Sequence, residues 1–127
     1  MKKRILVLLT VVALVVVMLA SVALAITKTC SASPCYGTNK DDTLTERRGV
    51  NDKIHGLRGD DTIRAGLLAR GPDTDILHGN WGSDRLKSDD LEGRDVLYGG
   101  RGHDVCIIDS GDRTHGCEKV KVVSFPA

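Results

Sequence analysis

Two patterns of hydrophobic and polar residues divide the chain. Residues 5–26 are almost continuously apolar, whereas residues 37–107 carry single apolar side chains between polar neighbours. Such an x-apolar-x unit predicts a minimal β-strand, in which alternation turns the middle side chain inward and its neighbours outward. Stacked strands of this kind form one narrow apolar ladder, made of Leu44, Ile54, Ile63, Leu77, Leu86, Leu97 and Cys106.

The single apolar residues belong to a nine-residue repeat. Residues 56–64 (GLRGDDTIR), 79–87 (GNWGSDRLK) and 99–107 (GGRGHDVCI) share glycine at the first and fourth places, aspartate at the sixth and an apolar residue at the eighth. Weaker copies keep the aspartate and the apolar residue at 37–45, 47–55, 70–78 and 90–98. The sixth-place aspartates are Asp42, Asp52, Asp61, Asp75, Asp84, Asp95 and Asp104, with separations of 10, 9, 14, 9, 11 and 9 residues. Every second step is nine, which indicates a structural period.

The composition agrees with a thin core. The chain has 127 residues but only one Trp, two Tyr and one Phe, too few large side chains for a conventional sandwich or bundle. The part beyond residue 25 suffices for one small domain and excludes a two-domain enzyme. Each ladder residue contributes about 1.5–3 kcal/mol by burial, against about 1–2 kcal/mol of backbone entropy for every residue fixed. The fold therefore needs another source of stability.

The repeated aspartates suggest that this source is a metal ion. Carboxylates that recur every nine residues line up on successive turns of a solenoid and repel one another. A hard cation between the turns reverses that effect, and calcium takes six to eight oxygen ligands from carboxylates and turn carbonyls. The pattern therefore predicts calcium binding that is coupled to folding.

The repeat resembles the hemolysin-type (RTX) calcium-binding nonapeptide family, whose unit reads GGxGxDxUx. The resemblance covers residues 37–107 and implies an all-β, right-handed parallel β-roll with two units in each turn. It implies ligands on one edge from Asp61, Asp84 and Asp104, and on the other from Asp52, Asp75 and Asp95, with Asp42 at the start. It also implies turn carbonyl ligands near Gly56, Gly59, Gly79, Gly82, Gly100 and Gly102.

The repeat departs from the family pattern in three respects. Lys40, Val50 and Asp73 stand at the fourth place instead of glycine. Like positions should be 18 residues apart, so extra residues at 67–70 and 87–90 are expected to bulge out as loops. Arginines within or beside the repeats could pair with the aspartates in place of calcium, namely Arg58, Arg85, Arg94 and Arg101. A few ions are therefore expected, bound more weakly than in a regular roll.

The N-terminal segment is typical of a signal peptide. Lys2, Lys3 and Arg4 precede the apolar run, and residues 23–25 (Ala-Leu-Ala) supply a cleavage site for signal peptidase. An uncleaved anchor is the alternative, because about 20 apolar residues can cross a bilayer. Cleavage leaves 15 basic and 17 acidic residues, a net charge of −2. The predicted organisation is a signal peptide at 1–25, an N-terminal cap at 26–36, repeats at 37–107 and a C-terminal cap at 108–127.

The four cysteines fit an exported protein. They allow three disulfide pairings, of which proximity favours Cys30–Cys35 and Cys106–Cys117, one at each end. A zinc site with His115 is the alternative, but the short double spacings of structural zinc are absent and an oxidising compartment favours disulfides.

Other chemistry is weakly indicated. Adjacent acidic pairs such as Asp60 and Asp61 are explained by the repeat, and no GxSxG or HExxH motif is present, so catalysis is not expected. His55 and His78 share the outward ninth place and could meet on neighbouring turns or stay solvated, and Trp81 is expected as a lid on the edge of the roll. Scattered arginines disfavour nucleic acid, and the alternating residues 119–123 predict a last strand.

The sequence therefore favours a small, exported, monomeric bacterial protein that binds calcium as a structural ligand. The protein is secreted or held at the cell surface, with no membrane contact after cleavage. The competing hypothesis is a metal-independent β-solenoid that serves as a surface or adhesion element, held by its disulfides and Arg–Asp pairs.

Overall fold

The computed structural model describes residues 3–4, 24–47, 50–65, 73–91 and 94–124. The predicted signal peptide lies almost entirely outside these residues. No helix among the described residues is long and apolar enough to cross a membrane.

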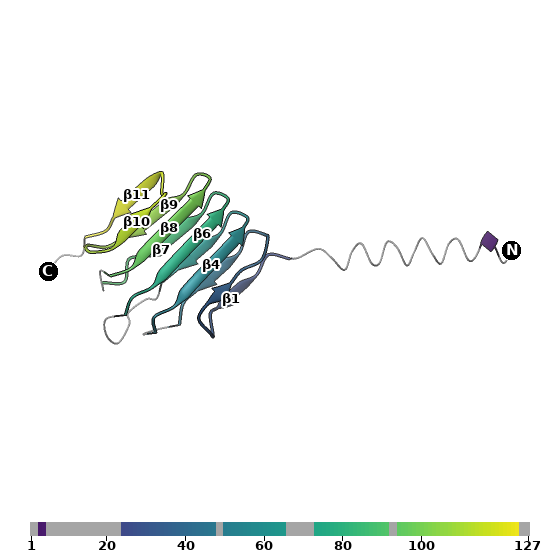
Figure 1. Cartoon of the computed structure of the whole chain (residues 1–127), viewed down its shortest axis with the longest axis horizontal. Coiled ribbons are helices and arrows are strands. Elements are labelled where there is room, and N and C mark those ends of the chain that lie inside the picture. The colour runs from purple at the N-terminus through teal and green to yellow at the C-terminus, as the bar shows by residue number, and fades with distance from the viewer. Residues whose placement is uncertain (1–2, 5–23, 48–49, 66–72, 92–93, 125–127) are drawn as a thin grey trace.

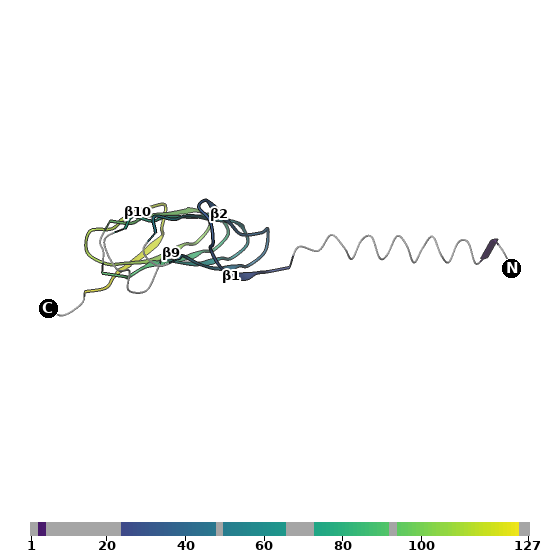
Figure 2. The same ribbon diagram turned by 90° about the horizontal axis from the view of Figure 1, so that it is seen from below.

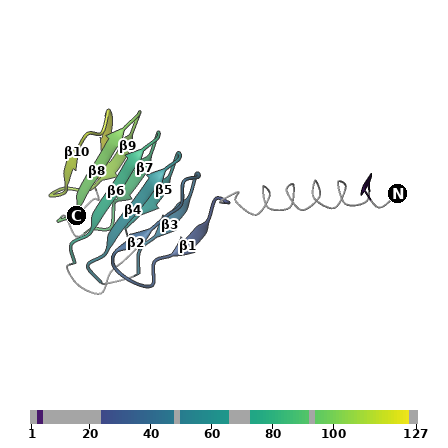
Figure 3. The ribbon, with the colours of Figure 1, turned by 45° about the vertical axis from the view of Figure 1, so that its right-hand side comes forward.

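The short x-apolar-x units form the strands of a parallel β-solenoid with two facing sheets (Figures 1 and 3). The strands are β1 Thr27–Thr29, β2 Cys35–Tyr36, β3 Thr43–Thr45, β4 Lys53–Arg58, β5 Thr62–Arg64, β6 Ile76–Trp81, β7 Arg85–Ser88, β8 Val96–Arg101, β9 Val105–Ile108, β10 Arg113–His115 and β11 Lys119–Val122. One sheet has the order β1-β3-β5-β7-β9-β11 and the other β10-β8-β6-β4-β2. Figure 2 shows the flattened cross-section, with one sheet above the other.

The register of the strands stacks the apolar eighth places directly above one another. In the six-stranded sheet Leu44 pairs with Ile63, which pairs with Leu86. In the five-stranded sheet Ile54 pairs with Leu77 and then with Leu97. The seven predicted ladder residues are all fully buried at 0% exposure: Leu44, Ile54, Ile63, Leu77, Leu86, Leu97 and Cys106. The predicted β-roll and its core are confirmed.

The segments predicted as caps contribute strands to both sheets. At the N-terminal end β1 pairs with β3 and β2 pairs with β4. At the other end β10 pairs with β8 and β11 pairs with β9. The solenoid is therefore longer than the recognisable repeats, and residues 119–122 form the predicted last strand.

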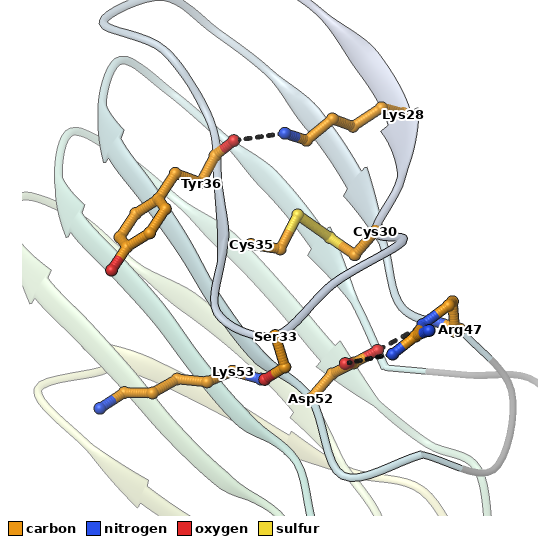
Figure 4. Close-up of a disulfide and its surroundings, with 8 residues drawn as sticks. All are labelled: Lys28, Cys30, Ser33, Cys35, Tyr36, Arg47, Asp52 and Lys53. Carbon is orange, nitrogen blue, oxygen red and sulfur yellow. Dashed lines mark hydrogen bonds and ion pairs between the residues drawn. A yellow bond between two sulfur atoms is a disulfide. The ribbon is translucent and has the colours of Figure 1, made fainter.

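A disulfide closes each end of the roll. Cys30 bonds Cys35 with an S–S distance of 2.12 Å, which joins the end of β1 to the start of β2 (Figure 4). Cys106 bonds Cys117 at 1.97 Å. The favoured pairing is therefore present, and the described chain has no free cysteine for a zinc site.

The connections between the sheets form two unlike edges. Short turns lead from the five-stranded to the six-stranded sheet at 37–42, 59–61, 82–84, 102–104 and 116–118, and we call them the glycine edge. The return connections form the loop edge, which the structure describes at 30–34, 46–47, 50–52, 65, 73–75, 89–91, 94–95 and 109–112. The expected loop at 67–70 lies outside the described residues. The prediction of a loop at 87–90 is wrong for Lys87 and Ser88, because both belong to β7 and pair with residues of β9.

Five aromatic and histidine rings stack along the outer face of the five-stranded sheet. Their order is Tyr36, His55, His78, Tyr98 and His115, with centroid separations of 5.1, 4.5, 4.8 and 5.0 Å. The two ninth-place histidines therefore meet. Burial lowers the pKa of His78 to about 4, with smaller effects of His55 and Lys53, so this ring is neutral at pH 7. Parallel stacking of the five rings stabilises the face of the sheet.

Trp81 lies at the end of β6 and is 51% exposed. The guanidinium carbons of Arg58 and Arg101 lie 5.8 and 4.5 Å from its ring centroid. This geometry is a cation–π arrangement on neighbouring strands. The indole therefore packs against two arginines at the end of the strand.

The ladder gives a direct test of the fold. Leu77→Ala in the oxidised, calcium-loaded protein should lower the free energy of unfolding by about 2–5 kcal/mol, because it leaves a cavity in a core one side chain wide. Leu91→Ala removes the same atoms from a side chain that is 58% exposed. This substitution should change the free energy of unfolding by about 0.5 kcal/mol or less. Chemical denaturation measures both, and equal effects would contradict the ladder.

Candidate metal sites in the turns

Charge is segregated between the strands and the edges. The eleven strands of the described chain contain no aspartate or glutamate, although they contain lysine or arginine in most cases. The acidic residues therefore all lie in the connections. The two edges are acidic and the two sheet faces are basic, so a small net charge conceals strong local fields.

On the glycine edge each sixth-place aspartate hydrogen-bonds to the turn before it. The backbone N–H of Asp42 donates to Asp61 Oδ1 at 2.8 Å, that of Asp61 to Asp84 Oδ1 at 2.9 Å, and that of Asp84 to Asp104 Oδ1 at 2.8 Å. The four carboxylates are at most 1% exposed. Glu118 supplies the last rung, since its Oε2 accepts from Asp104 N–H at 2.6 Å.

The loop edge repeats this ladder with a second set of aspartates. Asp52 N–H donates to Asp75 Oδ1 and Asp75 N–H to Asp95 Oδ1, both at 2.8 Å. Asp95 N–H donates to Asp112 Oδ1 at 2.9 Å. The structure thus places the candidate ligands on the two edges in the grouping expected from the sequence. Sequence reasoning missed the terminal rungs Asp112 and Glu118, which lie beyond the last readable repeat.

In five of these aspartates the second carboxylate oxygen has no hydrogen-bond partner within the described chain. This holds for Oδ2 of Asp61, Asp75, Asp84, Asp95 and Asp104. Asp42 and Asp52 differ, because the backbone N–H groups of Thr38 and Arg47 donate to their Oδ2 atoms. A buried carboxylate oxygen without a donor is costly, and its natural complement is a cation.

The first and fourth glycines make room around these oxygens. A Cβ atom added at Gly79 would lie 2.2 Å from Asp84 Oδ2, and one added at Gly56 would lie 2.1 Å from Asp61 Oδ2. Gly82 has a φ of 135°, and a Cβ atom there would lie 1.9 Å from the carbonyl oxygen of Gly59. Glycine therefore allows carboxylates and turn carbonyls to approach one another along the edge.

Burial raises the pKa of several carboxyl groups on both edges. The pKa of Asp61 rises to about 7 and that of Asp84 to about 6, and neighbouring carboxylates add to the effect of burial. On the loop edge the pKa of Asp75 and of Asp95 rises to about 8, again chiefly through burial, and at Asp75 a side-chain hydrogen bond with Glu46 adds to the increase. Accepted backbone hydrogen bonds offset only part of the increase. The edges therefore favour neutralisation, by protons or by a metal.

Arginine does not provide that neutralisation in the way the sequence suggested. Arg58 and Arg101 lie against Trp81, and neither Arg85 nor Arg94 comes within 4.0 Å of a described carboxylate. The described ion pairs are Arg47 with Asp52 at 3.7 Å, drawn in Figure 4, and Lys87 with Asp89 at 2.9 Å.

The fifth places form a separate, outer ladder on the glycine edge. Asp60 N–H donates to Asp41 Oδ1 at 2.8 Å, and Ser83 N–H donates to Asp60 Oδ1 at 2.7 Å. Asp41 and Asp60 are exposed. The adjacent acidic pairs thus have one inward and one outward member, which agrees with the interpretation of these pairs as part of the repeat.

The donor set fits calcium. It consists of carboxylate oxygens and turn carbonyls, the hard ligands that Ca²⁺ prefers, on a parallel β-roll with aspartate-lined turns. The family model of the RTX calcium-binding nonapeptide repeat (4 copies) matches residues 49–67, 71–90 and 89–114. The chain belongs to this family. Neither the curated proteins nor the solved structures contain a match to the chain.

The raised pKa values predict an unusual pH dependence for the metal-free protein. A carboxyl group whose folded pKa lies above its ordinary value of 3.8 binds more protons folded than unfolded, so its stabilising effect is lost as the pH rises through the folded pKa. After chelation of metals, the unfolding temperature should therefore rise when the pH falls from 8 to 6. Below about pH 6.5 the lowered pKa of His78 opposes this gain, because the unfolded histidine takes up the proton first.

Thermal unfolding followed by circular dichroism at constant ionic strength measures this dependence. Asp75→Asn and Asp95→Asn should each flatten it, because the amide does not titrate and still accepts the ladder hydrogen bond. An unfolding temperature that falls steadily as the pH is lowered from 8 to 6 would contradict the raised pKa values of the buried carboxyl groups.

Proposed function

We propose that the protein binds calcium in the turns of its β-roll and that the ions serve as structural ligands. The buried, unpartnered Oδ2 atoms of Asp61, Asp84 and Asp104 on the glycine edge carry this proposal. Backbone carbonyls of the adjoining glycine turns complete the ligand set, and Asp52, Asp75 and Asp95 extend it to the loop edge. Oδ2 of Asp75 and of Asp95 is likewise without a hydrogen-bond donor, whereas Asp52 pairs with Arg47. The protein has no catalytic role.

Electrostatics explains why the roll needs the ions. At neutral pH, ionised carboxylates on successive turns repel one another at the separation of adjacent strands, in surroundings largely shielded from water. A divalent ion between two turns converts this repulsion into attraction. Binding to the folded chain alone then stabilises it in proportion to the logarithm of calcium concentration.

The competing function is a metal-independent surface or adhesion element. A roll with either function would be stabilised by the hydrogen bonds to Oδ1, the disulfides and the stacked rings. These features therefore do not distinguish calcium binding from the metal-independent function. The second oxygens do, because a cation both satisfies these buried oxygens and neutralises their charge, and a metal-independent roll has no use for them. Calcium binding is therefore the better supported function.

The proposed setting is outside the cell. Proteins with RTX repeats are generally secreted, and two disulfides suit an oxidising compartment. The basic and apolar residues 1–25 act as the export signal in this proposal, and the released protein is a monomer that contacts neither membrane nor nucleic acid. A millimolar extracellular calcium supply would suit sites of modest affinity.

An asparagine substitution separates the ligand role of the aspartates from their role in the ladder. In Asp61→Asn and Asp84→Asn the side-chain oxygen still accepts the backbone N–H, but the charge is lost. Each variant should lower the calcium affinity at least about tenfold, since even an outer-shell partner contributes about 10- to 100-fold. Far-ultraviolet circular dichroism of the oxidised, chelated protein, titrated with calcium, gives the apparent affinity.

Asp60→Asn is the matched control. It changes the neighbouring charge on the same turn, but its side chain is exposed and its oxygen can still accept from Ser83 N–H. It should titrate like the unaltered protein. A β-sheet spectrum that is the same with chelator and with calcium, in all variants, would favour the metal-independent solenoid instead.

A further inference from the structure

A cluster of three buried carboxylates lies on the loop edge. Glu46, Asp75 and Asp90 each place a carboxylate oxygen within 4.8 Å of the other two. Their residue exposures are 3%, 0% and 5%. Two of the three, Glu46 and Asp90, do not occupy the aspartate place of the repeat, so the repeat pattern does not account for their burial.

Strand alternation explains how these residues meet. After the inward Leu44 and the outward Thr45 of β3, Glu46 is the next inward position; after Leu86 of β7, Asp90 is the second inward position beyond it. Asp75 precedes β6 on the connection between them. The cluster therefore joins three successive connections of the loop edge.

Ala65, which lies on the connection between those of Glu46 and Asp90, leaves room for their side chains. Backbone hydrogen bonds from Glu46 to Arg64 and from Ala65 to Lys87 set Glu46 and Ala65 on neighbouring rungs. Ala65 is buried and offers only a methyl group. A long carboxylate side chain can thus extend along the roll beside a small residue.

Asp75 provides a second observation besides the clustering. Its Oδ1 accepts the N–H of Asp52, while its Oδ2 receives no donor from the described chain and the residue is fully buried. A buried acceptor of this kind, next to two further carboxylates, matches the surroundings of a cation rather than of a hydrogen-bond donor.

We infer that Glu46, Asp75 and Asp90 bind a divalent cation in a site separate from the glycine turns. The ligands are all oxygens, which selects a hard ion. An ion with Ca²⁺–O distances of about 2.3–2.6 Å can bridge oxygens up to about 5 Å apart, whereas Mg²⁺ at about 2.0–2.1 Å bridges only about 4 Å. Calcium covers the whole range of the observed separations and is the ion to test.

This site shares Asp75 with the loop-edge ligands of the proposed function, but its other two carboxylates, Glu46 and Asp90, come from outside the aspartate place of the repeat. On the glycine edge glycine and backbone carbonyls complete the ligand set, whereas the loop edge has lost its fourth-place glycines at Val50 and Asp73. Carboxylate side chains from longer connections take their place here. The site can therefore be present or absent independently of the turn sites.

Calcium stoichiometry tests the inference. The number of ions bound per oxidised chain is measured by equilibrium dialysis and by titration calorimetry at pH 7.5, for the unaltered protein, Glu46→Gln and Asp90→Asn. Each variant should bind one ion fewer. Asp89→Asn is the matched control, because this neighbouring carboxylate turns outward to Lys87 and its removal should leave the number unchanged.

The outcomes separate this site from the proposed function. Loss of one ion in Glu46→Gln and Asp90→Asn supports the inference, even if Asp61→Asn and Asp84→Asn bind as many ions as the unaltered protein. An unchanged number in the first two variants overturns it, as expected if Glu46 and Asp75 share a proton, whatever the turn variants do. Circular dichroism in excess calcium establishes that each variant is folded, and Asp90→Glu should restore the lost ion.

Discussion

The structure depends on one recurring interaction, the hydrogen bond from a backbone N–H to the buried carboxylate of the next turn. This bond fixes the distance between turns and the inward direction of each aspartate, for example from Asp61 N–H to Asp84 Oδ1. It satisfies only one of the two carboxylate oxygens. The other stays buried without a donor, so the interaction that aligns the turns also creates a need for positive charge. Fold and candidate function thus have the same physical origin.

The near-neutral net charge of the chain does not argue against cation binding. Averaging over the sequence mixes acidic edges with basic sheet faces, and the described structure pairs few of these charges, namely Arg47 with Asp52 and Lys87 with Asp89. Arg58 and Arg101 lie beside Trp81, away from the aspartates that they could have paired with. At the distance between sheet face and turn, solvent screens much of any remaining attraction. The field that a cation meets at an edge is therefore set by local carboxylates.

Much of the fold could be predicted, because the nine-residue repeat and the alternation of apolar and polar residues predict the same strands. The apolar eighth place fixed both the strands and their stacking, and Leu77 and Cys106 lie where the ladder predicted. The carboxylates of the glycine edge could be predicted for the same reason. Glu46, Asp90 and Glu118 could not, because insertions break the period on the loop edge and the repeat ends before residue 118. Their partners are set by inward alternation across turns, which single-sequence spacing does not reveal.

The two edges differ because one of them is closed to insertion by backbone contact. On the glycine edge an added Cβ atom at Gly82 or Gly102 would lie 1.9 or 1.7 Å from a carbonyl oxygen of the preceding turn, so successive turns touch without intervening side chains. An extra residue there would separate every neighbouring turn. The connections of the loop edge are mostly longer, and residues can be added to them without disturbing the sheets. These longer connections also bring further oxygens to the ladder, namely the buried carboxylates of Glu46 and Asp90.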